Sequence, residues 1–351
     1  MKESKNIYEL LNHMNINLED YEPEDLNDME KQSLKSRFRK SGRRRINFKK
    51  IGAIAAMAVL TLGFFSQTNL GANVYAAAES KIAEISYSIG KTMGIERDIA
   101  PYAKVVNQTV EDNGVEVKLS DVIMDKDEII FSILVNMNKP VDGFRFNDQI
   151  FINGRKLTNY GATGSSGAID NSDTVFYLTS AVDAKGIELS DDIDMKIVLS
   201  DLNYYADGSE KSMKGKWEFE FTANGKELMA NTQVFPLDYS FSIDNQNYML
   251  EEFRCNPVNQ KIFGKIKGKS KFSYTVDLRG HDNSGNEVVF FLTSVSGEDL
   301  VFKYENIQGD LSDKITSLTL TPYAAQLPEK SGKMSNDYKQ VGEEFTILLN
   351  D

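Results

Sequence analysis

Hydrophobic residues near the start of the chain recur at helical spacing. Leu10 and Leu11 follow Ile7 by three and four positions, which places them on one face of a helix with it. A second short helix is expected after Pro23, because proline suits the first turn of a helix. The apolar positions expected to bind a partner are Ile7, Leu10, Leu11, Met14, Leu26, Met29 and Leu34. An arm this short cannot bury its apolar face alone, so we expect a partner to cover it. A weakly ordered tether is the alternative.

A long uncharged stretch begins at Ile51 and continues to Ala78. About twenty apolar residues are needed to cross a bilayer core, so we expect a transmembrane helix over residues 51–70. The preceding residues 31–50 contain ten Lys or Arg and no acid. Such a basic flank marks the cytoplasmic side of a membrane span, which favours a cytoplasmic arm over residues 1–48. A nucleic-acid patch is the weaker interpretation of the basic run.

The same stretch contains a rival signal, because small residues around Ala76 resemble a signal-peptide cleavage point. A secretory signal has only a few residues before its apolar core, whereas about 50 precede this one. A retained anchor is therefore favoured over cleavage after Ala76. Beyond it, Ile82, Ile85 and Ile89 form another helical stripe, and we expect an amphipathic helix over residues 79–96 that packs on the outer domain.

From about Tyr102 onward the hydrophobic period changes to two, as residues 115–119, 193–199 and 216–221 show. Asn-Gly pairs at 113–114, 153–154 and 224–225 indicate hairpins, and residues 125–127 a further tight turn. The Gly- and Ser-rich residues 161–167 indicate a flexible loop. The pattern predicts a mainly β protein with two antiparallel, immunoglobulin-like β-sandwich domains, at residues 100–228 and 232–351, outside the membrane.

Composition limits the chemistry that this chain can perform. The 351 residues carry a net charge of −12 and include one cysteine and two histidines, which leaves few zinc sites or histidine-based triads. Cys255 is expected to be a small buried residue, and Trp217 a core residue. The carboxylates of Asp121, Asp125, Asp127 and Glu128 cluster in sequence. We interpret them as solubilising a turn, with calcium binding as the alternative. No catalytic, cofactor-binding or metal-binding residue is predicted.

Several passages occur in a characteristic order: residues 7–12, the basic run, the apolar segment, residues 85–90 and residues 106–131. Together they resemble a family of Gram-positive membrane proteins described as anti-sigma-factor-like. The resemblance covers roughly residues 5–230, and the C-terminal part resembles the immunoglobulin-like domain that commonly follows. It implies a single-pass regulator with an extracytoplasmic domain of unknown function. It names no catalytic residues.

We therefore expect a cell-membrane protein with a cytoplasmic N-terminus and extracellular β domains. Its arm would sequester an extracytoplasmic-function sigma factor, and its outer domains would sense the state of the envelope. The expected partners are a sigma factor, the lipid bilayer and an envelope ligand or protein, without direct nucleic-acid binding. The alternative is a cell-surface or envelope binding protein with no transcriptional role, and a remoter one is an envelope hydrolase.

Overall fold

The computed structural model describes residues 82, 85, 87–189, 191–306, 309–328 and 336–349, all within one compact unit of the chain. The predicted arm, the transmembrane helix over 51–70 and the cleavage point after Ala76 lie outside the described residues. Within the described ranges, no helix has the length and apolar character needed to cross a membrane.

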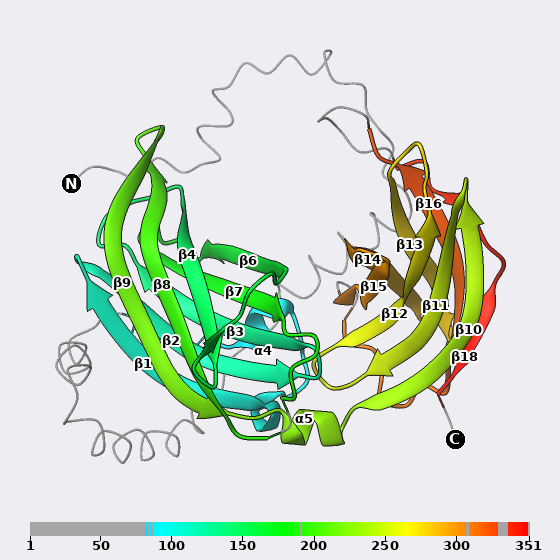
Figure 1. The fold of residues 1–351 in the computed structure, drawn as a ribbon, viewed down its shortest axis with the longest axis horizontal. Coiled ribbons are helices and arrows are strands. Elements are labelled where there is room, and N and C mark those ends of the chain that lie inside the picture. Colours follow the sequence, from blue (N-terminus) through cyan, green and yellow to red (C-terminus); the bar gives the residue numbers. More distant parts are fainter. Residues whose placement is uncertain are drawn as a thin grey trace, which may run out of the picture. The chain divides into compact units, whose positions relative to one another are not determined.

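The described chain is mainly β, as predicted (Figure 1). Its helical elements are α4 (Ile89–Met93), η3 (Ala100–Tyr102) and α5 (Lys226–Ala230). The strands before α5 are β1 (Ala103–Asp112), β2 (Val115–Asp125), β3 (Glu128–Asn136), β4 (Gly143–Ile152), β5 (Arg155–Lys156), β6 (Ala162–Ala168), β7 (Val175–Asp183), β8 (Ile193–Ala206) and β9 (Ser209–Ala223). Those after it are β10 (Gln233–Ile243), β11 (Gln246–Cys255), β12 (Gln260–Gly268), β13 (Tyr274–Asp282), β14 (Glu287–Ser296), β15 (Asp299–Tyr304), β16 (Ser317–Gln326), β17 (Lys339–Gln340) and β18 (Phe345–Leu348).

Residues 103–223, here called the first β unit, form two antiparallel sheets around one core. The described strands are ordered β1-β2-β3-β7-β6 in one sheet and β5-β4-β8-β9 in the other. Leu119 and Ile133 of the first sheet share a buried cluster with Ile197 and Phe219 of the second. The alternation of apolar and polar residues read from the sequence therefore fills the space between the two sheets.

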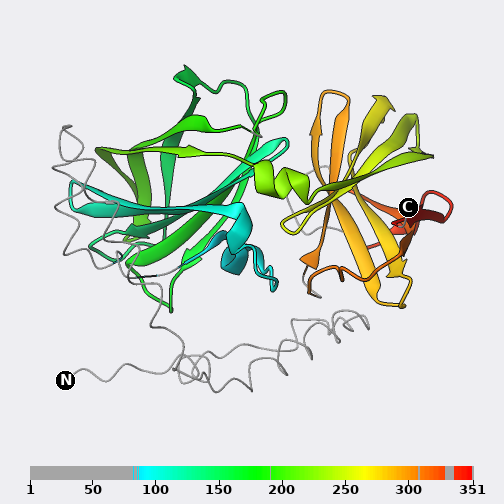
Figure 2. The ribbon, with the colours of Figure 1, turned by 90° about the horizontal axis from the view of Figure 1, so that it is seen from below.

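Residues 233–348, the second β unit, form a single sheet rather than two. Its described strands follow the order β10-β11-β12-β15-β14-β13-β16-β17, and β18 also pairs with β16. The rings of Tyr239 in β10 and Phe345 in β18 stack at 4.0 Å, so the sheet curls and encloses its own core. Figure 2 shows the two β units with α5 on the chain between them.

Two of the Asn-Gly turns were predicted correctly, and one was not. Asn113 and Gly114 both have positive φ, at 52° and 76°, as expected for the turn that joins β1 to β2. Asn153-Gly154 joins β4 to β5 in the same way. At the third pair, Gly225 has φ −102° and precedes α5, so this pair begins a helix instead of a hairpin.

The predicted flexible loop at 161–167 is wrong, because residues 162–168 form strand β6. All seven residues pair with β7, from Ala162 opposite Val182 to Ala168 opposite Phe176. A Cβ atom added at Gly164 would lie 2.5 Å from the carbonyl oxygen of Thr179. The glycine that suggested a loop is thus required by the close approach of two strands.

Among the described residues of the predicted helix over 79–96, only α4, Ile89–Met93, is helical. Ser88 begins it by accepting a hydrogen bond from the backbone N–H of Lys91, and Gly94 ends it at φ 70°. The apolar stripe is nevertheless buried, since Ile82 and Ile89 are both 0% exposed. The caps at Ser88 and Gly94 therefore set the length of the helix, and the apolar side chains of the stripe are buried by packing on the sheet.

Trp217 lies in the core as predicted, fully buried, and its Nε1 donates a 2.9 Å hydrogen bond to the carbonyl oxygen of Val115. We expect Trp217→Phe to lower the free energy of unfolding by about 2–4 kcal/mol, because it leaves a cavity and an unpaired buried carbonyl. Urea unfolding followed by circular dichroism measures the loss. The control is Tyr205→Phe at a half-exposed position, which should leave the unfolding midpoint unchanged. Equal effects of the two variants would contradict the placement of Trp217 in the core.

Candidate functional site: the joint between the β units

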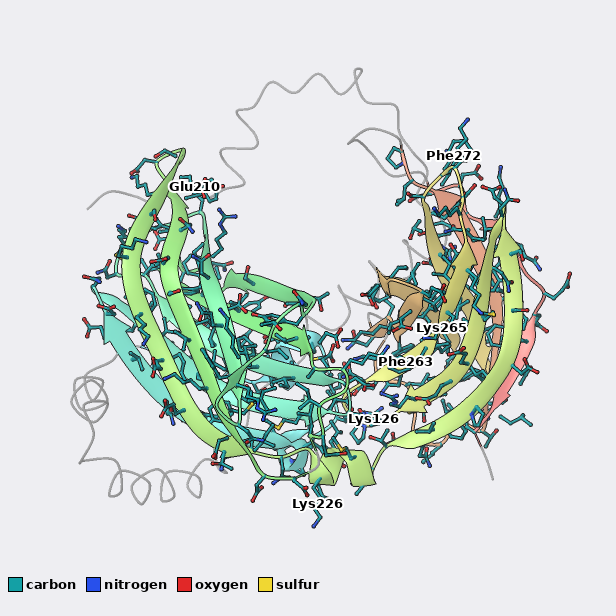
Figure 3. The ribbon with its side chains drawn as sticks, viewed as in Figure 1. Lys126, Glu210, Lys226, Phe263, Lys265 and Phe272 are labelled. Carbon is teal, nitrogen blue, oxygen red and sulfur yellow. The ribbon has the colours of Figure 1, made fainter. Side chains whose placement is uncertain are left out.

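The turn between β2 and β3, residues 125–128, places three carboxylates against the second β unit. The Asp125 carboxylate is buried and accepts two amide hydrogen bonds, each 3.1 Å long, from Asn256 and Asn259. The backbone N–H of Lys126 donates to it at 2.8 Å. Figure 3 labels Lys126 in this turn, together with Phe263 and Lys265 on β12. We call this contact, residues 125–128 with residues 252–261, the joint.

The amides that hold Asp125 are themselves fixed by the turn between β11 and β12. Asn256 accepts hydrogen bonds from the backbone N–H groups of Val258 and Asn259, at 2.9 and 2.8 Å, through Oδ1. Its Nδ2 is therefore directed at Asp125 by local turn chemistry. Asn256 and Asn259 are each only 3% exposed, so this arrangement is part of a packed interior.

Two cations of the second β unit complete the joint. Arg254 forms an ion pair with Asp127 and is held from its own strand by Glu252, 2.7 Å away. Its guanidinium also covers the Phe263 ring at 4.2 Å. Lys261 donates a 2.8 Å hydrogen bond to Glu128, to which Asn259 also donates. Charged groups this deeply buried require such partners, because a lone buried charge is costly.

Lys303 lies beside these cations but makes no hydrogen bond or ion pair with any residue that the structure describes. It faces Lys261 across the pairing of β12 with β15, and Phe291 across the pairing of β14 with β15. Burial lowers the pKa of the Lys303 ammonium; Glu128 opposes this shift and Lys261 adds to it. Lys303 is therefore a cation whose charge the joint does not fully compensate.

A strap formed by residues 87–102 connects to both β units. On the first unit, the backbone N–H of Ile89 donates a 3.1 Å hydrogen bond to the buried Asp121 carboxylate. Ile89 and Ile99 also pack with Ile123 and Ile130 of the sheet, in a cluster that includes Val258 of the second unit. The strap thus covers the outer face of the first sheet close to the joint.

On the second unit, the strap is held by Arg97 and its neighbours. Arg97 donates to Asp313 at 2.8 Å and to the carbonyl oxygen of Leu311 at 2.5 Å. The backbone N–H groups of Glu96 and Arg97 both donate to Asp310, at 2.9 and 2.8 Å. Asn306 donates to the carbonyl oxygen of Met93 at 2.6 Å. Movement of either β unit relative to the other would therefore strain the hydrogen bonds between the strap and the two units.

The structure changes our interpretation of the acidic cluster at residues 121–128. These carboxylates do not solubilise an exposed turn: Asp125 is 4% exposed and Asp121 7%. Asp121 binds the strap, whereas Asp125, Asp127 and Glu128 bind amides and cations of the second unit. The cluster is therefore a docking element instead of a group of calcium ligands.

Other residues singled out from the sequence lie apart from the joint or were missed. Cys255 is partly buried on the second core, and burial raises the pKa of its thiol to about 11. The seven predicted partner-binding residues, Ile7 to Leu34, lie outside the described residues. Sequence reasoning missed Arg254, Asn256 and Lys261; their only local signal was the Asn-Pro turn that follows a β pattern.

Comparison with known proteins adds two family models. Residues 43–136 match one described as a domain of unknown function (DUF4179), and residues 232–349 match one described as a family of unknown function (DUF5643). No curated protein matches. The first match runs from the basic segment through β3, and the second covers the second β unit. The joint therefore connects residues of one matched region to residues of the other.

Nine chains of solved structures match, and one of them illustrates the similarity of fold. It is described as the conserved domain protein from Bacillus anthracis, with a TM-score of 0.55 and 16% sequence identity. The match covers 71% of this chain and 92% of that chain. At this identity the likeness concerns the fold alone.

The ion pair between Lys261 and Glu128 should contribute coupling between the β units. A double-mutant cycle with Lys261→Met and Glu128→Gln should give a coupling free energy of about 1–3 kcal/mol, because both side chains are more than four-fifths buried. Urea unfolding provides the measurement. The matched control is Lys211→Met with Asp207→Asn, an exposed pair within one hairpin, for which no measurable coupling is expected. Equal coupling free energies in both cycles would contradict the claim that the Lys261–Glu128 pair couples the two β units.

Asp121 should make stability depend on pH in an identifiable way. Burial raises the pKa of its carboxyl from 3.8 to about 6, so the folded chain binds this proton more tightly than the unfolded chain does. The stability of the wild type relative to Asp121→Asn should therefore fall by about 2–3 kcal/mol as pH rises from 4 to 6, and then stay constant. Unfolding curves of both proteins at pH 4, 5, 6 and 7 test this. A wild type that becomes more stable relative to Asp121→Asn as pH rises would contradict it.

Proposed function

We propose that this chain is a membrane-anchored regulator of the anti-sigma-factor type. In this proposal, residues 51–70 span the membrane, residues 1–48 sequester an extracytoplasmic-function sigma factor in the cytoplasm, and both β units face outward. Sequestration is occlusion of a surface by the apolar positions of the arm and requires no catalytic residue. We further propose that the first β unit, whose two sheets enclose one core, is an immunoglobulin-like variant.

The observation that carries the proposal is the strap, residues 87–102. It follows the predicted membrane segment and is hydrogen-bonded to Asp121 of the first β unit and to Asp310 of the second. A signal that changes how the β units contact each other would reach the membrane through this segment. The matched region 43–136 supports the idea, because it includes the end of the basic run, the apolar stretch and the strap together.

The joint is suited to respond to a signal from outside the cell. It is held by buried polar contacts, and such contacts fail together when one partner is removed, because the remaining charges lose their compensation. A ligand or a proteolytic cut that separates Asp125 from Asn256 would therefore release the strap from one unit. The state of the joint would then be transmitted to the arm by tension or by proteolysis near the membrane.

The arm is tested by recovery of a partner from membranes. Tagged full-length chain, expressed in a Gram-positive host with its neighbouring genes, should co-purify with a sigma factor. Leu10→Asp with Leu11→Asp should abolish recovery, because the change places charges on the apolar face. The matched control, Asn12→Asp with His13→Asp, should retain it.

Either of two outcomes would contradict the regulatory proposal. One is that no sigma factor is recovered, and the other is that the Leu10 and Leu11 variant recovers it normally. Deleting residues 2–30 distinguishes the alternative, an envelope binding protein without a transcriptional role. In that case the deletion would leave target transcription unchanged.

The strap makes a separate prediction. Arg97→Ala should weaken the attachment of the strap to the second β unit, because it removes the side-chain contacts with Asp313 and Asp310 and leaves only the backbone hydrogen bonds to Asp310. Transcription from the sigma-dependent promoter should then change by several-fold without loss of the chain from the membrane. A promoter fusion and an immunoblot measure the two quantities. The control is Arg145→Ala, which removes an exposed ion pair with Glu210 within the first β unit and should have no effect.

A further inference from the structure

Strand β6 has an edge that lacks the usual protection against pairing. It is the last strand of the five-stranded sheet, and among the described residues it pairs only with β7. Its sequence, Ala-Thr-Gly-Ser-Ser-Gly-Ala, contains no charged residue and no proline, and its pairing has no register shift. Natural sheets normally protect such edges with charges, prolines or bulges, because unpaired N–H and C=O groups attract another strand.

The opposite edge of the same sheet is protected. Strand β1 has a register shift between Val105 and Gln108, and it carries several charged side chains. The Gln108 side chain donates a 2.9 Å hydrogen bond to the carbonyl oxygen of Glu220 in β9. Asn113, next to β1, donates to the carbonyl oxygen of Lys214 at 3.0 Å. The two edges therefore differ, and β6 is the one left open.

A groove with a volume of about 570 Å³ runs beside β6. Thr163, Gly164 and Ser165 of β6 line it on one side, and Phe291 and Lys303 of the second β unit line it too. This volume falls within the range of about 300–1,000 Å³ that is typical of ligand sites. A strand that paired with β6 would enter the groove and come within reach of these side chains.

The polar groups of the groove indicate what this strand would carry. Lys303 has no ion-pair partner in the described chain, as noted above. Asn259 and Thr179 also line the groove, but these residues are only 3% and 5% exposed, and their Oδ1 and Oγ1 atoms are buried away from its surface. Phe291 is 38% exposed there and offers an apolar contact. A ligand that is partly apolar and carries one carboxylate would contact Phe291 and Lys303 together.

We propose that the groove binds an extended segment of a partner polypeptide, which adds to the free edge of β6 as a further strand and places a carboxylate beside Nζ of Lys303. Main-chain hydrogen bonds to β6 would supply much of the affinity, while Lys303 and Phe291 would select an acidic and an apolar side chain. The proposal rests on the groove itself and does not depend on the sigma-factor partner of the arm.

Charge complementarity favours a foreign segment over a second copy of this chain. Pairing of two β6 edges would bring together two strands without any acidic residue. The charge of Lys303 would then remain incompletely compensated inside a more deeply buried site, which is unfavourable. A small free anion could compensate Lys303 but would leave the β6 edge and Phe291 unoccupied.

The test uses full-length chain in lipid nanodiscs and a displayed library of random ten-residue peptides. Selection should enrich peptides with one Asp or Glu among alternating apolar residues. The best peptide should bind Lys303→Gln at least ten-fold more weakly than it binds the wild type. A peptide in which the acid is replaced by its amide should bind the wild-type protein as weakly as the original peptide binds Lys303→Gln. This amide peptide should lose no further affinity when it is tested on Lys303→Gln. The matched control, Lys267→Gln at an exposed position of β12, should bind normally.

The backbone part of the proposal has its own readout. Methylation of alternate peptide nitrogens should abolish binding in one register and leave it nearly unchanged in the other, because only one side of a strand faces β6. Hydrogen exchange across residues 160–169 should slow in the complex. Ser165→Pro should abolish binding, with thermal melts confirming that Ser165→Pro and Lys303→Gln remain folded.

Four results would overturn the proposal. They are the absence of any peptide enriched above background, equal binding by Lys303→Gln, tolerance of N-methylation in both registers, and a dimer of the free chain that Ser165→Pro dissociates. The last result would assign the edge to a second copy of this chain.

Discussion

The burial of the Asp125 carboxylate between the side chains of Asn256 and Asn259 is the contact on which the arrangement of the two β units depends. A carboxylate withdrawn from water has to recover its lost hydration through hydrogen bonds, and here the donors come from a segment more than 130 positions away in sequence. Because Asn256 is oriented by its own turn, the second β unit presents preformed donors. The ion pairs of Arg254 and Lys261 then add specificity around a contact that is already set.

This dependence makes the joint selective as well as stabilising. An apolar contact of similar size would tolerate sliding, whereas amide-to-carboxylate hydrogen bonds hold only in a narrow range of distance and angle. The strap depends on the same arrangement, since its hydrogen bonds to Asp121 and Asp310 form together only when both β units are correctly placed. Polar interiors of this kind define one arrangement at some cost in stability, which suits a part of a protein that has to change state.

Features governed by neighbouring residues could be predicted from the sequence, and those governed by distant partners could not. The turn at Asn113-Gly114 was identified because its backbone angles are dictated by the two residues themselves. The sequence of strand β6 predicts a loop, because its glycines are required by a close approach to β7 that no local pattern reveals. The acidic turn at residues 125–128 is predicted to be solvated, because its amide and cationic partners lie in another part of the chain. The predicted membrane segment and arm stay predictions, since they lie outside the described residues.

The clamp of Arg97 on Asp310 and Asp313 also imposes an order on biogenesis. Its two halves are separated by 213 and 216 positions, so the strap can meet the first β unit long before its second anchor has been synthesised. At about 5–20 residues per second, the interval is on the order of 10–40 seconds. During that time the nascent chain has a half-anchored strap and an unsatisfied arginine. A chain that stops before Asp310 would remain in this immature form, so completion of translation would itself be a checkpoint for assembling the two β units.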